Sequence, residues 1–417
     1  MIVDEVEFSY CEGWDADLRD AAGPLSTERA RRLDEAGSQY AVLLRVAGRP
    51  AAIAEIAWSA GYCSVWSVDG QGRRDSQAVW LLLEDDRLFL RRERSWRYDV
   101  PERPEFHGEA ARRELTVDPD GRTLSVEEPR GDAGGSTHAA DRIPADARWR
   151  RVPAFGDWAV LAETLGRRDG WEVAPRVVLR DVSPAEDGGL PGGPLPWRPP
   201  RPLRPEGVDR MFRHGARYRL RTAEEEGEAR EVAIEVEEAG TVRLPSGRVV
   251  AADPSSMEFG EKPLTTAVAP GAYPLLLARV RFADEPGHAR VAAARLVIAD
   301  RSAATWELGV RDGEDPRLLD DGEFYGFGVD AGLGCFVDAT AAEALGGLVW
   351  EDWDDWTGGP EQRPAELTDP ATGANLLAFG TGWGDGSYPV WVGRDRDGAV
   401  VGLVADLLVL HSAEPLG

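Results

Sequence analysis

A proline- and glycine-rich segment, Ser183–Pro205, interrupts the 417-residue chain near its middle. It reads SPAEDGGLPGGPLPWRPPRPLRP, and so many prolines and glycines cannot sustain a helix or a central strand. This composition is typical of an extended, semi-rigid linker. A chain of this length also exceeds one ordinary hydrophobic core. We therefore predict an N-terminal domain over residues 1–182, a linker over 183–205 and a C-terminal domain over 206–417.

Short apolar runs separated by turn residues predict a mainly β fold, a β-rich α+β arrangement, in both domains. No strand alternates with a long amphipathic helix, which disfavours a doubly wound parallel sheet. We expect two antiparallel-sheet domains with a few short helices. The strands predicted in the first domain are Tyr40–Val46, Ala51–Trp58, Tyr62–Val68, Val79–Leu83, Leu88–Arg91, Glu114–Val117 and Thr123–Val126.

The second domain repeats the pattern with longer strands and ends in a hairpin around an Asp-Gly turn, the strongest local signal in the chain. A serine at the start and a glycine at the end predict a helix over Ser26–Gly37. A second helix is predicted over Trp158–Leu165, and a third follows Asp338 as its N-cap. The strands predicted in the second domain are Leu275–Phe282, Val291–Ala299, Thr305–Val310, Tyr388–Gly393 and Val400–Leu410.

The net charge of the chain restricts the classes of partner that it could bind. A formal net charge of −26 repels nucleic-acid phosphates and anionic membranes, whereas it attracts divalent cations or a basic protein. No apolar run is long enough to span a membrane, and the acidic N-terminus is unlike a signal peptide. The three cysteines, Cys11, Cys63 and Cys335, are scattered and predict reduced thiols. We expect a cytoplasmic protein that binds neither nucleic acid nor membrane.

Two glycine-punctuated, acidic segments, Tyr325–Asp338 and Gly382–Trp391, are the candidate site. Glycines this dense mark tight turns or places where the backbone approaches something closely. Small polar groups stand beside them, which suits a site without identifying a reaction. These groups are Asp330, Cys335, Asp338, Asp385, Ser387 and Tyr388.

Two interpretations of these segments stay open. In a hydrolase or metal-dependent enzyme, Asp330 and Asp385 would act as acid, base or metal ligand. Cys335 would be the nucleophile, with His288 or His411 nearby. In the structural interpretation, Asp385 bonds its own turn and Cys335 is a small buried hydrophobe. The histidines show no metal-ligand spacing, so we assign no metal site, and the cofactor is unknown.

A tryptophan and acid cluster suggests a different activity. Trp350, Trp353 and Trp356 recur at spacing three, with four acidic residues among them. On a helix they would share a face and could anchor a basic partner if exposed. If buried, they would pin a loop onto a sheet. Ser387 and Tyr388 are further candidate binding residues, and exposed tryptophans could also bind a small molecule or sugar.

Several ordered motifs resemble one known family. These are Val249–Pro254 (VVAADP), Tyr325–Gly332 (YGFGVDAG), Gly334–Asp338 (GCFVD), Gly384–Pro389 (GDGSYP) and the ending Val400–Leu410. Together they resemble the bacterial family called domain of unknown function 4241, over roughly residues 247–410. The resemblance implies no activity and no catalytic residues. We therefore expect an acidic binding protein for a basic partner, with an enzyme and a small-molecule or sugar-binding module as alternatives.

Overall fold

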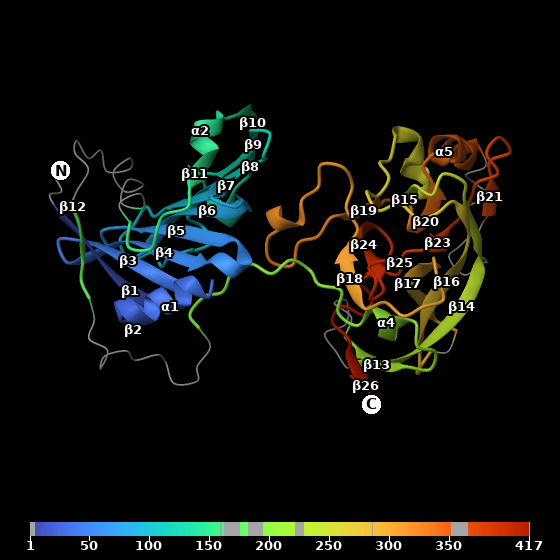
Figure 1. Cartoon of the computed structure of the whole chain (residues 1–417), viewed down its shortest axis with the longest axis horizontal. Coiled ribbons are helices and arrows are strands. Elements are labelled where there is room, and N and C mark those ends of the chain that lie inside the picture. The colour runs from blue at the N-terminus through green and yellow to red at the C-terminus, as the bar shows by residue number, and fades with distance from the viewer. Residues whose placement is uncertain are drawn as a thin grey trace. The chain divides into compact units, whose positions relative to one another are not determined.

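The computed structural model describes residues 5–158, 161, 176–181, 195–221, 229–285, 287–351 and 366–416. Strands dominate these ranges, and every pair of neighbouring strands described there is antiparallel except one. The predicted mainly β fold with a few short helices is confirmed. The chain forms two compact units, Met1–Pro200 and Arg201–Gly417, which we describe separately (Figure 1).

One large sheet forms the first unit. Its strands β3 to β10 lie side by side in chain order, drawn from blue to green in Figure 1. Short turns join the strands up to β7, whereas longer loops connect β7 to β8 and β9 to β10. Strand β1 pairs with β3 on one side and, in parallel, with β12 on the other. The strands are β1 Glu5–Asp15, β2 Asp20–Leu25, β3 Tyr40–Val46, β4 Arg49–Ala57, β5 Tyr62–Val68, β6 Arg74–Glu84, β7 Arg87–Arg97, β8 Ala111–Val117, β9 Arg122–Glu128, β10 Thr137–Arg142, β11 Trp149–Arg151 and β12 Arg176–Leu179.

The helices of the first unit are short. They are α1 Thr27–Glu35, α2 Ala145–Arg148 and the single-turn helices η1 Trp58–Ala60 and η2 Gly131–Ala133. The predicted Ser26 cap is confirmed, because its hydroxyl accepts a hydrogen bond from the Arg29 N–H at 3.3 Å. Most of the helix predicted over Trp158–Leu165 lies outside the described residues.

Two residues from the predicted linker pack on the first unit. The indole N–H of Trp197 donates to the carbonyl of Glu12 at 2.9 Å. A methyl group on Gly13 would lie 2.6 Å from Cγ of Pro196. Only glycine therefore permits this close approach, and it ties residues 196–197 to β1.

A sheet of nine strands is the centre of the second unit. Its main path runs β18-β24-β25-β17-β16-β14-β13-β26, and β19 pairs with β24 off that path. The strands are β13 Arg217–Leu220, β14 Arg230–Leu244, β15 Val249–Ala252, β16 Gly271–Phe282, β17 Ala289–Val297, β18 Thr305–Leu308, β19 Gly326–Val329, β20 Leu333–Asp338, β21 Glu366–Thr368, β22 Asn375–Leu377, β23 Phe379–Gly380, β24 Gly386–Arg394, β25 Val400–Asp406 and β26 Glu414–Leu416.

The helices of the second unit are short. They are α4 Val208–Met211, α5 Ala342–Glu351, η4 Pro254–Phe259 and η5 Pro316–Leu318. Helix α5 packs with β15 and β20 over a buried apolar cluster (Figure 1). It begins at Ala342, later than predicted. The Asp338 carboxylate does accept from the Thr340 N–H at 2.9 Å, but it also binds Ser246, so it closes the turn before the helix.

The C-terminal hairpin is present, but its boundaries differ from those predicted, and β24 runs from Gly386 to Arg394 rather than from Tyr388 to Gly393. Strands β24 and β25 pair around the Asp-Gly turn as predicted. Strand β25 ends at Asp406 rather than Leu410. Leu408 has a φ of 57°, a left-handed conformation that no strand can continue. The chain therefore turns away from the sheet there.

Candidate functional site

Asp253 joins two of the sequence motifs. Its carboxylate is 1% exposed and accepts four hydrogen bonds. One oxygen accepts from the N–H groups of Asp330 and Ala331, at 2.9 and 2.8 Å. The other accepts from the N–H and hydroxyl of Ser255, both at 2.8 Å. A fully bonded buried carboxylate therefore holds the turn that follows β19.

Thr381 and Tyr388 fix the second glycine-rich segment. The Tyr388 hydroxyl lies 2.7 Å from the carbonyl oxygen of Gly384 and 3.0 Å from that of Thr381. The Thr381 N–H donates to the Gly332 carbonyl at 3.0 Å, which links the two segments. Tyr388 is buried, and this burial raises the pKa of its hydroxyl. The predicted binding residue Tyr388 thus supports the loop from inside.

The strand register places two predicted carboxylates opposite each other. Strands β19 and β24 pair from Gly326 with Pro389 to Val329 with Gly386. Asp330 and Asp385 are the next residues on each side of that last pair. Both are exposed, and neither side chain has a hydrogen-bond or ion-pair partner among the described residues. The register therefore places both exposed acids at the same end of this strand pair.

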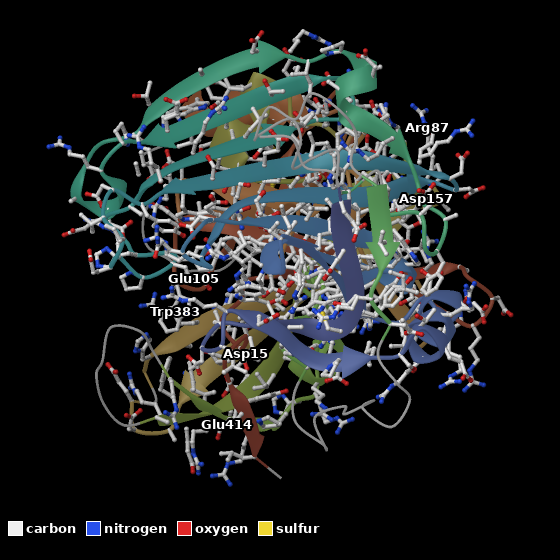
Figure 2. The ribbon with its side chains drawn as sticks, turned by 90° about the vertical axis from the view of Figure 1, so that its left-hand side faces the viewer. Asp15, Arg87, Glu105, Asp157, Trp383 and Glu414 are labelled. Carbon is white, nitrogen blue, oxygen red and sulfur yellow. The ribbon has the colours of Figure 1, made fainter. Side chains whose placement is uncertain are left out.

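An exposed tryptophan stands beside them. Trp383 is 47% exposed and is labelled in Figure 2. The guanidinium carbon of Arg290 lies 5.6 Å from the centre of its ring. Sequence reasoning did not select Trp383, although its position between two glycines signals a loop that cannot bury a large side chain. Ser387 is also exposed. We call Asp330, Trp383, Asp385 and Ser387 the loop surface.

Cys335 lies apart from the loop surface. It is fully buried in the cluster under α5, with its sulfur 3.7 Å from that of Met257. Burial raises the pKa of the Cys335 thiol, so it stays protonated at neutral pH. A nucleophilic cysteine needs the opposite environment. His288 instead contacts Glu285 at 3.2 Å, and His411 is exposed.

In the described part of the chain, no group of three or more His, Cys, Asp and Glu side chains is placed to hold an ion. Trp350, at the end of α5, is 46% exposed and donates its indole N–H to the Ser255 carbonyl at 3.0 Å. Trp353 and Trp356 lie outside the described residues. Of the three tryptophans in the predicted cluster, only Trp350 lies among the described residues.

The second unit is thus a β-rich module in which three of the sequence motifs meet at one loop junction, beside an exposed acidic and aromatic surface. Residues 242–405 match the family described as Protein of unknown function (DUF4241). The resemblance drawn from the motifs is confirmed for this part of the chain. No curated protein and no solved structure matches the chain. Across the described ranges, no helix has the length and apolar character needed to cross a membrane.

Proposed function

We propose that the protein binds a basic protein partner through the loop surface. The observation that carries this proposal is the pair of exposed carboxylates, Asp330 and Asp385, at the end of one strand pair, which have no side-chain partner among the residues that the structure describes. Two neighbouring negative charges repel each other. An arginine or lysine of the partner would neutralise both and form charge-assisted hydrogen bonds. Binding therefore removes an unfavourable interaction of the free protein.

The surroundings of the carboxylates support the same partner chemistry. The backbone on either side is held by the buried side chains of Asp253 and Tyr388, so little ordering is required on binding. The Trp383 ring offers a flat apolar surface and a face that attracts cations. The net charge of −26 would steer a basic partner toward the protein from a distance.

A cytoplasmic location belongs to this proposal. Cys11, Cys63 and Cys335 are all free and buried. Free thiols are compatible with a reducing compartment, where disulfides rarely form.

The test compares two double variants that each remove two negative charges. Asp330→Asn with Asp385→Asn neutralises the loop surface, whereas Asp312→Asn with Asp397→Asn neutralises exposed acids elsewhere in the same unit. Partners are captured from native lysate at low salt, identified, and titrated as purified proteins. We expect a basic partner whose affinity falls at least about tenfold with the first double variant, which corresponds to about 1.4 kcal/mol.

The control variant should bind nearly as well as the wild type, and added salt should weaken wild-type binding. Equal losses in both double variants would mean that net charge alone attracts the partner. Unchanged binding in the first variant would remove the loop surface from the interaction.

A further inference from the structure

A second candidate binding site lies on the sheet of the first unit. Three aromatic rings cluster there: Trp66 on β5, Trp96 on β7 and Phe106 in the loop that follows. The indole rings of Trp66 and Trp96 stack with centres 6.0 Å apart. Phe106 contacts both, at 4.8 Å from Trp96 and 5.6 Å from Trp66. All three keep part of their surface exposed, and Phe106 is 37% exposed.

Phe106 is held in a conformation that a large residue rarely adopts. Its φ is 57°, which is strained for any residue with a Cβ. The Phe106 N–H donates to the Tyr98 hydroxyl at 3.2 Å. A guanidinium nitrogen of Arg73 bonds the carbonyls of Val100 and Arg103 at 3.1 and 3.0 Å. These contacts stabilise the loop in the conformation that keeps the Phe106 ring beside the two tryptophans.

Gln77 lies on the same face of the sheet. It is directly opposite Trp66 on one side and Arg94 on the other, so these three side chains share a face. Gln77 is 7% exposed, yet its amide has no partner in the part of the chain that the structure describes. The amide is not among the unpaired polar groups sealed from solvent. A ligand on this face can reach a donor and an acceptor that the fold leaves unused.

Ion pairs surround the rings. Arg74 lies over the rings of Trp66 and Phe106, 4.9 and 5.0 Å from their centres. It pairs with Glu105, labelled in Figure 2, at 2.7 Å. Arg94 pairs with Glu114 at 2.7 Å in the same way. Glu114 also contacts Arg92, at 3.5 Å. These ion pairs present both donors and acceptors, which a neutral ligand that donates and accepts hydrogen bonds would complement.

We propose that this face binds a neutral carbohydrate. The apolar C–H face of a sugar ring would stack on the exposed part of the aromatic cluster. Sugar hydroxyls would bond the Gln77 amide and the Arg94–Glu114 pair, as expected where a few fixed polar groups orient a ligand on an aromatic surface. The site lies in the first unit, so it is independent of the basic partner proposed for the second.

The test uses the full-length chain and three neutral probes: cellohexaose, maltohexaose and chitohexaose. Binding is followed by tryptophan fluorescence and by calorimetry. We expect at least one probe to bind with a dissociation constant of about 1 mM or below, insensitive to added salt. Gln77→Leu should weaken that binding at least about tenfold, which corresponds to the loss of one or two ligand hydrogen bonds.

The stability of Gln77→Leu separates binding from structure. Leucine removes an unpaired amide from a nearly buried position, so thermal stability should stay equal or rise while binding falls. Gln71→Leu, in the exposed turn before β6, is the matched control and should bind like the wild type. A lower melting temperature for Gln77→Leu would point to a structural role, and Trp96→Ala then provides the second test of binding.

Three results would overturn the proposal. The first is that none of the three saccharides binds at about 10 mM, well beyond the range of specific affinity. The second is that a saccharide binds Gln77→Leu and Trp96→Ala as tightly as the wild type. The third is that a neutral Gly-Ser peptide binds where no saccharide does, which would assign the face to peptides instead.

Discussion

Single buried carboxylates organise the loops of the second unit, and Asp338 is the one whose protonation can be followed. Its oxygens accept from the N–H of Ser246 at 2.8 Å and from that of Thr340 at 2.9 Å. Burial by itself would raise the pKa of Asp338, but these bonds and those from both hydroxyls outweigh it and lower the pKa below its usual value. The carboxylate therefore stabilises the fold only while it is ionised.

Asp338→Asn should lower the free energy of unfolding by about 1–3 kcal/mol at pH 7, because an amide N–H would face the donors of Ser246. The folded pKa lies below the unfolded value of about 3.9, so the contribution is complete above that pH and is lost as the pH falls through the folded pKa. Urea denaturation at pH 7 and pH 3 measures the difference. It should shrink at pH 3, because the unfolded carboxyl protonates below its pKa of about 3.9 and part of the advantage of the ionised folded state is then lost.

The exposed Asp312→Asn substitution is the control and should have little effect at either pH. A destabilisation by Asp338→Asn that is identical at pH 7 and pH 3 would contradict the role of the ionised carboxylate.

The roles that could be predicted from sequence are those of residues whose hydrogen-bond partners lie close to them along the chain. Asp338 bonds Thr340 two positions away, so its capping-type role follows from the helix pattern beside it. Asp253 holds Asp330, 77 positions away, and that pairing exists only once β15 and β20 have come together. Gln77 was equally hidden, because its neighbours Trp66 and Arg94 come from two other strands.

At the scale of elements, strand β19 offers a direct test of the glycine-rich motif. A methyl group on Gly326 would lie 2.3 Å from the Tyr388 carbonyl oxygen, a contact that must be relieved by moving β19 from β24. A methyl group on Gly328, on the same strand, meets nothing within 4 Å. Neither glycine has a positive φ, so the two substitutions differ mainly in available space.

Gly326→Ala should therefore destabilise the protein by about 1–3 kcal/mol, the cost typical of overpacking. Gly328→Ala should stay within about 0.5 kcal/mol of the wild type. Chemical denaturation of both variants measures the difference. Equal effects of the two substitutions would contradict the close approach of β19 to β24.

Strand prediction succeeded where turns were explicit. The β24–β25 hairpin follows from Asp397 and Gly398, which favour a tight turn between apolar runs. Strand β1 was not predicted, although Val6 and Phe8 alternate with polar residues and are buried. Strand β14 was not predicted either. It bends at a bulge near Gly240, and glutamates occupy much of its exposed side, so its composition resembles that of a solvated loop.

At the scale of the whole molecule, the chain contains two separate hydrophobic interiors. One buried cluster of the first unit joins Cys11, Leu43 and Ile53, whereas the largest cluster of the second joins residues from Val208 to Leu410. Neither cluster includes residues of the other unit. The loop surface and the cluster of Trp66, Trp96 and Phe106 consequently depend on different cores. Substitutions in one of these two sites should leave the other intact.

We therefore predict two thermal unfolding transitions in the full-length chain, measured by differential scanning calorimetry. Each unit has about 200 residues, so its midpoint should shift by about 2–4 °C for each kcal/mol of altered stability. Gly326→Ala should lower the midpoint of the second unit and leave that of the first unit unchanged. Gln77→Leu should affect only the midpoint of the first unit. A single transition that both substitutions move together would mean that the two cores unfold as one cooperative structure.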